Sequence, residues 1–243
     1  MPGNALIRDG APRLPGWYGK IPALGDFASR RLPPAFITVW DAWLQRGMAA
    51  SRSSLQEHWL ETYLNGPLWS FALFPGVCGD CAWAGILMPS VDKVGRHFPL
   101  TIAVELEAQP DIIEAILSAQ CWYSELEQVA LDSLNAGFDP DSLEERLAAT
   151  PFPLTQRSQE PAGARHLARW WDGAPGAAMA LELPAREAIH ELFQAAGLSY
   201  YARAGRASSM WWTEAAAGDA IRLLAFPGLP GEFDFATLLA AGD

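Results

Sequence analysis

The sequence has few cysteines, no long apolar run and a deficit of basic residues, and each shortage excludes a class of protein. Its three cysteines are too few, and odd in number, for a disulfide framework, which suits a reducing cytoplasm. No apolar stretch approaches the roughly 18 residues that span a bilayer. The 17 basic against 28 acidic residues give a formal charge of −11, which opposes nucleic acid and anionic membrane surfaces. We expect a cytoplasmic protein with no nucleic-acid partner and no membrane insertion.

Motifs that bind cofactors, metals or phosphates are also missing. Neither GxxxxGK[ST] nor GxGxxG occurs, and there is no GxSxG elbow and no HExxH pair. The segment CGDC, Cys78 to Cys81, has the spacing of half a zinc site or a redox pair, but no second CxxC follows. A turn with a thiol on either side explains it equally well. The residues therefore predict no cofactor, no metal and no catalytic nucleophile.

About half of the 243 residues are apolar, which is enough to build one sizeable core. Residues 1–15 carry Pro and Gly where a signal peptide needs an apolar run, so we expect a disordered leader there. Residues 16–243 should form a single domain. In the region from 151 to 176, rich in Pro, Gly, Gln and Arg, we expect an irregular excursion.

Hydrophobic periodicity and turn residues predict the elements of this domain. Helices are expected over 33–48, 53–64, 111–134, 141–149 and 184–196, with a short one after GLPGEF. Strands are expected over 69–74, 81–88, 100–106, 177–183, 198–203, 208–214 and 220–226. This irregular alternation predicts an α/β fold whose mixed sheet carries helices on both faces.

Several charged residues lie in loops beside the predicted strand ends. Lys20 and Asp26 stand in YGKIPALGDF, and Asp92 and Arg96 stand in PSVDKVGRHFPL. The planar guanidinium of Arg96 suits a carboxylate or a phosphate, and either aspartate could accept it. Two interpretations stay open: these charges bind a partner, or they only pin the loops to the sheet.

Tryptophan is abundant, at eleven residues. Most of these fall at positions that should be buried, but Trp211 and Trp212 are adjacent on a predicted strand and must point to opposite faces. One of them can enter the core. The other covers a helix or presents an aromatic surface to a partner.

Taken together, the stretches GWYGKIPALGDF, LPPAFITVWDAWLQRGMAAS, AWAGILMPSVDKVGRHFPLT and SMWWTE resemble the TagF family, which is associated with bacterial type VI secretion. The resemblance is strongest from Gly16 to Leu106. It implies a three-layer α/β/α sandwich with a mixed, largely antiparallel central sheet. It also implies a non-enzymatic, post-translational repressor of secretion that binds Fha, a cytoplasmic forkhead-associated scaffold protein.

We therefore expect the two polar loops to converge on one patch that contacts a protein partner. Its predicted members are Lys20, Asp26, Ser90, Asp92 and Arg96, with Trp211 or Trp212 as an aromatic wall. The alternatives are a cofactor-free hydrolase that uses Asp26 or Asp92 as base and Arg96 to bind an anion, or an anion-sensing domain centred on Arg96.

Overall fold

The computed structural model describes residues 12–107, 112–135, 137–153, 163–173, 179–186, 188–213 and 221–240, apart from the side chains of residues 117, 165 and 172. Within these ranges the centre of the fold is a seven-stranded sheet with the order β2-β1-β5-β4-β3-β6-β7. Its strands are β1 (Gly16–Gly19), β2 (Ala28–Arg30), β3 (Trp69–Leu73), β4 (Ala82–Met88), β5 (Leu100–Leu106), β6 (Ser208–Trp212) and β7 (Leu223–Pro227).

The predicted α/β class with a largely antiparallel sheet is confirmed. Every pairing between neighbours in this sheet is antiparallel, so the parallel component of a mixed sheet is not found among the described strands. The strands β3, β4 and β5 form the expected meander. Every residue of β4 is buried, as its apolar sequence AWAGILM predicts for a central strand. The short strand β2 was not expected, because ASR carries no apolar alternation.

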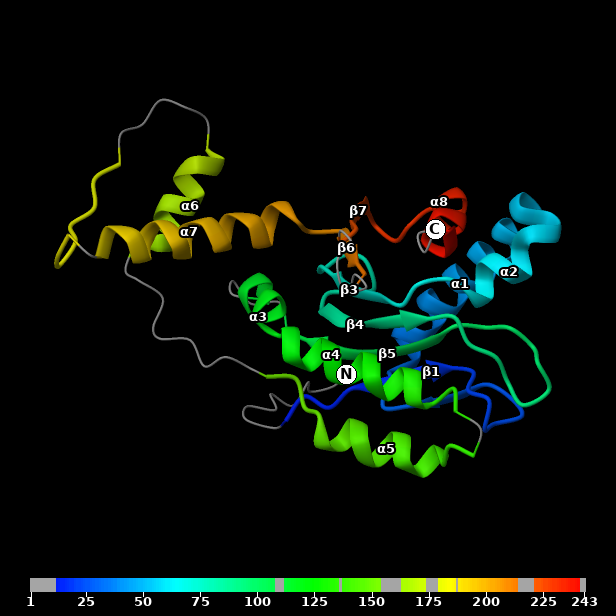
Figure 1. The fold of residues 1–243 in the computed structure, drawn as a ribbon. Coiled ribbons are helices and arrows are strands. Elements are labelled where there is room, and N and C mark those ends of the chain that lie inside the picture. Colours follow the sequence, from blue (N-terminus) through cyan, green and yellow to red (C-terminus); the bar gives the residue numbers. More distant parts are fainter. Residues whose placement is uncertain are drawn as a thin grey trace, which may run out of the picture.

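One face of the sheet is covered by an aromatic layer under three helices and a short 3₁₀ turn (Figure 1). These elements are α1 (Pro34–Leu55), η1 (Gln56–His58), α2 (Trp59–Leu64) and α8 (Glu232–Ala240). Proline begins α1 because the first helical position needs no N–H donor. The Trp40 ring stacks between Phe36 and Trp211, with centroid distances of 5.3 and 6.0 Å. The aromatic side chains of α1 therefore form the core of this layer.

The opposite face is covered by α3 (Ile112–Ser118), α4 (Gln120–Asp132) and α5 (Pro140–Ala149) (Figure 1). The single helix expected over 111–134 is two helices, because Ala119 departs from helical geometry at φ −88° and ψ 28°. The break lets Tyr123 lie under the sheet, where its hydroxyl donates to the Phe71 carbonyl at 3.1 Å. With helices on both faces, the sheet is the middle of three layers.

Two helices, α6 (Ala164–Asp172) and α7 (Ala188–Ala204), extend away from this sandwich as an arm (Figure 1). They pack on each other through a small cluster that includes Ala164, Ala168, Ala195 and Ala196. The irregular excursion expected over residues 151–176 is wrong for Ala164–Asp172, which form α6, while residues 154–162 and 174–176 lie outside the described residues. The strand expected over 198–203 lies within α7, and residues 179–183 form no strand. Residues 177–178 of that last expected strand lie outside the described residues.

The expected leader is only partly within the described residues. Residues 1–11 lie outside them. Residues 12–15 contact the domain: the Phe152 amide donates to the Arg13 carbonyl at 2.8 Å, and the Arg13 guanidinium pairs with Glu107. Arg13 therefore contacts the body of the domain, and the boundary at residue 16 stays a prediction.

The aromatic layer leads to a stability prediction. Replacing Trp40 with alanine should lower the free energy of unfolding by about 3–5 kcal/mol, because a fully buried indole leaves a cavity. Urea denaturation measures this. The matched control is Val39→Ala on the exposed side of the same helix, which should change the value by less than about 0.5 kcal/mol. Equal effects of the two substitutions would contradict the core role of Trp40.

Candidate functional site

The candidate site lies where the loop of residues 20–27 meets the loop of residues 89–99. Strand β1 pairs with β5 through Trp17 opposite Ile102 and Tyr18 opposite Thr101, so the end of β1 lies beside the start of β5. Gly19 has φ +133°, and a Cβ there would lie 2.1 Å from the Pro99 carbonyl oxygen. Glycine thus allows the close approach of the two backbones. We call Lys20, Asp26, Ser90, Asp92 and Arg96 the loop cluster.

The carboxylate of Asp92 is the centre of the loop cluster. Its Oδ2 accepts hydrogen bonds from Lys20 Nζ at 2.9 Å and from Arg96 Nε at 2.6 Å. Its Oδ1 accepts from the backbone amides of Val94 at 3.0 Å and Arg96 at 2.9 Å. The side chain is 0% exposed. Both carboxylate oxygens are therefore satisfied from within the protein.

These contacts decide the protonation of Asp92. Burial on its own would raise the pKa of the carboxyl group. The hydrogen bonds from the Arg96 amide, Lys20, the Arg96 side chain and the Val94 amide outweigh that effect and hold the pKa well below its usual range. Asp92 is thus an anion at neutral pH and a poor proton acceptor. This does not fit the role of general base that the hydrolase alternative gives it.

Lys20 and Ser90 link the loop cluster to its surroundings. The Lys20 side chain is almost completely buried, and its ammonium lies 4.7 Å from the centroid of the Phe27 ring. Ser90 Oγ donates to the Lys20 carbonyl at 2.7 Å. The hydroxyl of Tyr63, on α2, donates to the Ser90 carbonyl at 2.8 Å and accepts from its amide at 2.9 Å. Helix α2 and both loops are thereby held together.

Arg96 and Asp26 form the exposed side of the loop cluster. The Arg96 side chain is 56% exposed and the Asp26 side chain is 80% exposed. Arg96 Nη2 donates to the Gly25 carbonyl at 2.7 Å and lies 3.8 Å from Asp26 Oδ1. One edge of the guanidinium therefore joins the two loops while the rest of the group faces solvent.

The structure brings together the five polar residues that the sequence predicted, but it buries three of them and leaves two exposed. Lys20, Ser90 and Asp92 are buried and bind one another, which is the pinning arrangement that the sequence left open. Asp26 and Arg96 remain accessible. Contact between a partner and the loop cluster is therefore possible through its exposed side alone.

The predicted aromatic wall is wrong. Trp211 is 0% exposed and packs against Trp40, Trp43 and Phe71, because β6 turns this ring into the aromatic layer. Trp212 points to the opposite face, where its ring lies 4.9 Å from that of Tyr123. Two strands, β3 and β4, separate β6 from β5.

Other aromatic residues occupy the place of that wall. Phe27 is partly exposed, and its ring contacts Phe98 with a centroid distance of 4.7 Å and stacks over Tyr18 at 6.1 Å. The tip of the second loop exposes 70% of Val94. Sequence reasoning missed these residues as surface contributors. The signal was present, since Phe27 directly follows Asp26 and Val94 lies between Asp92 and Arg96.

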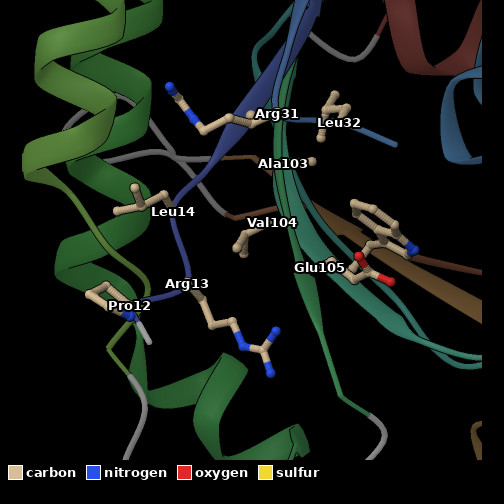
Figure 2. Close-up of a pocket in the computed structure, with 10 residues that line it drawn as sticks. Pro12, Arg13, Leu14, Arg31, Leu32, Ala103, Val104 and Glu105 are labelled. Carbon is tan, nitrogen blue, oxygen red and sulfur yellow. The ribbon is translucent and has the colours of Figure 1, made fainter. Parts of the chain in front are cut away.

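Two of the cavities that lie away from the loop cluster contain residues already named. One of about 280 Å³ opens between residues 12–14 and β5, with Arg13, Arg31 and Glu105 at its sides (Figure 2). Both arginines are already paired, Arg13 with Glu107 and Arg31 with Glu144. The other, of about 560 Å³, is almost entirely apolar and lies between α3, α7 and the strands β6 and β7, where Trp212 is part of its lining.

Within the described ranges, no group of three His, Cys, Asp or Glu side chains is arranged to hold a metal ion. No described helix has both the length and the apolar character needed to cross a bilayer. Burial raises the pKa of both thiols of the CGDC segment, to about 12 for Cys78 and about 11 for Cys81, where a hydrogen bond to Glu105 adds to the effect. High thiol pKa values disfavour the thiolate that metal binding or redox exchange needs.

An antiparallel sheet between two helical layers, with pinned polar loops at one sheet end, places the chain among α/β sandwich domains. Residues 16–150 match the family described as TagF N-terminal domain, type VI secretion system-associated. That match spans more than half of the chain. The chain belongs to this family and has a role related to type VI secretion.

A solved structure extends the likeness beyond residue 150. The crystal structure of PA0076 from Pseudomonas aeruginosa PAO1 is similar, with a TM-score of 0.73 and 33% sequence identity, covering 93% of this chain and 94% of that one. No curated protein matches the chain. The similarity includes the region after residue 150, which supplies β6, β7 and α8 to the sandwich.

The charge state of Asp92 leads to a prediction about pH. Its pKa is lower in the folded chain than in the unfolded chain, where it is about 3.9. The stabilisation from ionised Asp92 is therefore complete above about pH 5 and is lost as the pH falls below about 4. The difference in unfolding free energy between wild type and Asp92→Asn should be constant from pH 7 down to about 5 and then shrink. Denaturant titrations across this range measure it.

The matched control is Asp26→Asn, which removes an exposed carboxylate from the same loop cluster. It should leave the free energy of unfolding nearly unchanged at each pH. A wild-type advantage over Asp92→Asn that stays the same down to about pH 2 would contradict the proposed ion pairing.

Proposed function

We propose that this chain is a cytoplasmic, post-translational repressor of a type VI secretion system, and that it acts by binding a forkhead-associated scaffold protein. The observation that carries the proposal is membership in a family associated with this secretion system. Repression by binding requires a surface with a fixed shape rather than a reaction centre. The exposed side of the loop cluster, together with Phe27 and Val94, is the surface that we assign to this contact.

The geometry of the loops supports a binding role in two ways. The hydrogen bonds of Asp92 hold the loop of residues 89–99 in one conformation, so little conformational entropy is lost when a partner binds. Val94 and Phe27 are apolar groups that water covers in the free chain. Covering them with a partner would be favourable, and Arg96 beside them adds a donor group typical of protein interfaces.

The hydrolase alternative has weaker support. Its Asp92 is an anion with four hydrogen-bond donors around it, and its Arg96 already binds Asp92 and the Gly25 carbonyl. Neither cavity described above is lined by a member of the loop cluster. An anion sensor at Arg96 would have to compete with both internal acceptors.

The proposal is tested by binding of the purified scaffold to surface variants. Val94→Asp should weaken the affinity at least about tenfold, because it places a charge in the centre of the assigned contact. Val94 is 70% exposed, so the fold should be unaffected by the substitution. Isothermal titration calorimetry measures the affinity, and an assay of secreted proteins in cells should show loss of repression by the same variant.

The control for this experiment is Leu131→Asp, since Leu131 is an exposed apolar residue of α4 on the other helical layer. It should bind the scaffold like the wild type. Absence of binding by the wild-type chain, or equal binding by all three proteins, would refute the proposed contact. Consumption of a substrate by the purified chain that depends on Asp26 or Asp92 would favour the hydrolase instead.

A further inference from the structure

Basic side chains gather around the loop cluster in a chain that is otherwise acidic. The loops of residues 20–27 and 89–99 contain three basic residues, Lys20, Lys93 and Arg96, against two carboxylates, whereas the whole chain has 17 basic and 28 acidic residues. Lys20 is buried and neutralises Asp92. The charges that reach solvent from these loops are therefore Lys93, Arg96 and Asp26.

A further cation reaches the same region from the end of α1. The Arg52 guanidinium lies 4.2 Å from the centroid of the Trp59 ring. The Trp59 ring in turn contacts the His97 ring at 5.6 Å, one residue from Arg96. Arg52 thus packs on a ring that also contacts the loop of residues 89–99 through His97. We call Arg52, Lys93 and Arg96 the cationic band.

The carboxylates beside Arg96, Asp92 at 2.6 Å and Asp26 at 3.8 Å, offset part of the charge of the cationic band, and Lys20 balances Asp92 from the buried side. Burial lowers the pKa of His97, and the charges of Arg52 and Lys20 lower it further while that of Asp92 raises it, so the imidazole adds no charge at neutral pH. Glu57 is 3.7 Å from His58.

Apolar groups accompany the cationic band. Val94 is 70% exposed at the loop tip and directly follows Lys93. The Lys93 amide donates to the Leu24 carbonyl at 2.9 Å, which ties the loop tip to the loop that carries Phe27. The surface combines positive charge with two apolar side chains.

We infer that the cationic band docks an acidic segment of the partner protein, a segment that also carries an apolar side chain to cover Val94 and Phe27. This inference rests on the proposed function and specifies the chemistry of the partner at that surface. The inference rests on charge complementarity. The chain has a net charge of −11, so most of its surface repels an acidic segment, and a region with exposed basic side chains repels it less. The positive charges steer the segment toward the loops, and the apolar groups hold it there.

The test is the kinetics of scaffold binding at low and high salt. Arg52→Gln and Lys93→Gln remove single charges and keep a polar side chain, and the double charge reversal Arg52→Glu/Lys93→Glu changes the sign. The reversal should lower the association rate constant about tenfold or more at low salt and flatten its salt dependence, because steering by opposite charges is screened by ions. Single neutral substitutions should give smaller changes in the same direction.

The control is Arg186→Glu, an exposed arginine just before α7, one of the two helices of the arm that extends away from the sandwich (Figure 1). It should leave the association rate unchanged. Thermal unfolding of each variant shows whether loss of the Arg52 stacking has altered the fold. If the scaffold binds and the reversal leaves rate and salt dependence unchanged, or speeds association, the acidic-segment inference alone is wrong. If the scaffold does not bind the wild type, the proposed function fails and the inference fails with it.

Discussion

One buried carboxylate fixes the relative positions of the two loops and the sheet end. Asp92 accepts from a lysine of one loop and from an arginine and two amides of its own. Removing two such charges from water is costly, and only multiple hydrogen bonds compensate for it. A buried pair of this kind is therefore weak as a source of stability but strong as a constraint on geometry, because an alternative loop conformation would leave the Lys20 ammonium buried without a counter-charge.

The aromatic layer provides the frame to which those loops are attached. Trp40, Trp43, Phe71 and Trp211 stack across α1, β3 and β6 with centroid separations of 4.7–6.0 Å. Trp40 Nε1 also donates to Thr101 Oγ1 at 2.7 Å, on the strand that the loop of residues 89–99 enters. The loop cluster and the aromatic layer thus meet at β5. Both the packing of the core and the position of the loops therefore depend on the register of that strand.

Sequence reasoning succeeded where a local pattern determines the structure and failed where burial depends on the tertiary environment. Short apolar runs identified β3 and β4, apolar alternation identified β5, and these strands placed the loops that converge. The same patterns do not reveal that Lys20 and Asp92 pair inside, since charged loop residues are usually exposed. Adjacent tryptophans must face opposite sides of a strand, but the sequence does not say that helices cover both sides at β6. In α7 the β-favouring LSYYAR lies within a helix, because packing of Ala195 and Ala196 on α6 overrides local preference.

Some charged residues of the two loops are buried and others are exposed, and this difference determines which of them a partner can contact. Lys20 and Asp92 neutralise each other and shape the loop without facing solvent. Arg96 has a buried contact and an exposed surface. Its Nε binds the buried Asp92, while more than half of its side chain is exposed to solvent. A contact made to Arg96 by a partner therefore acts on a group whose orientation is already set by a buried anion. Such a guanidinium loses less conformational entropy on binding than a mobile one. Because its orientation is fixed, it also discriminates more strongly between acceptors of different geometry. Arg52, stacked on Trp59, is held in the same manner by a different interaction, so two of the three members of the cationic band are fixed before any partner arrives.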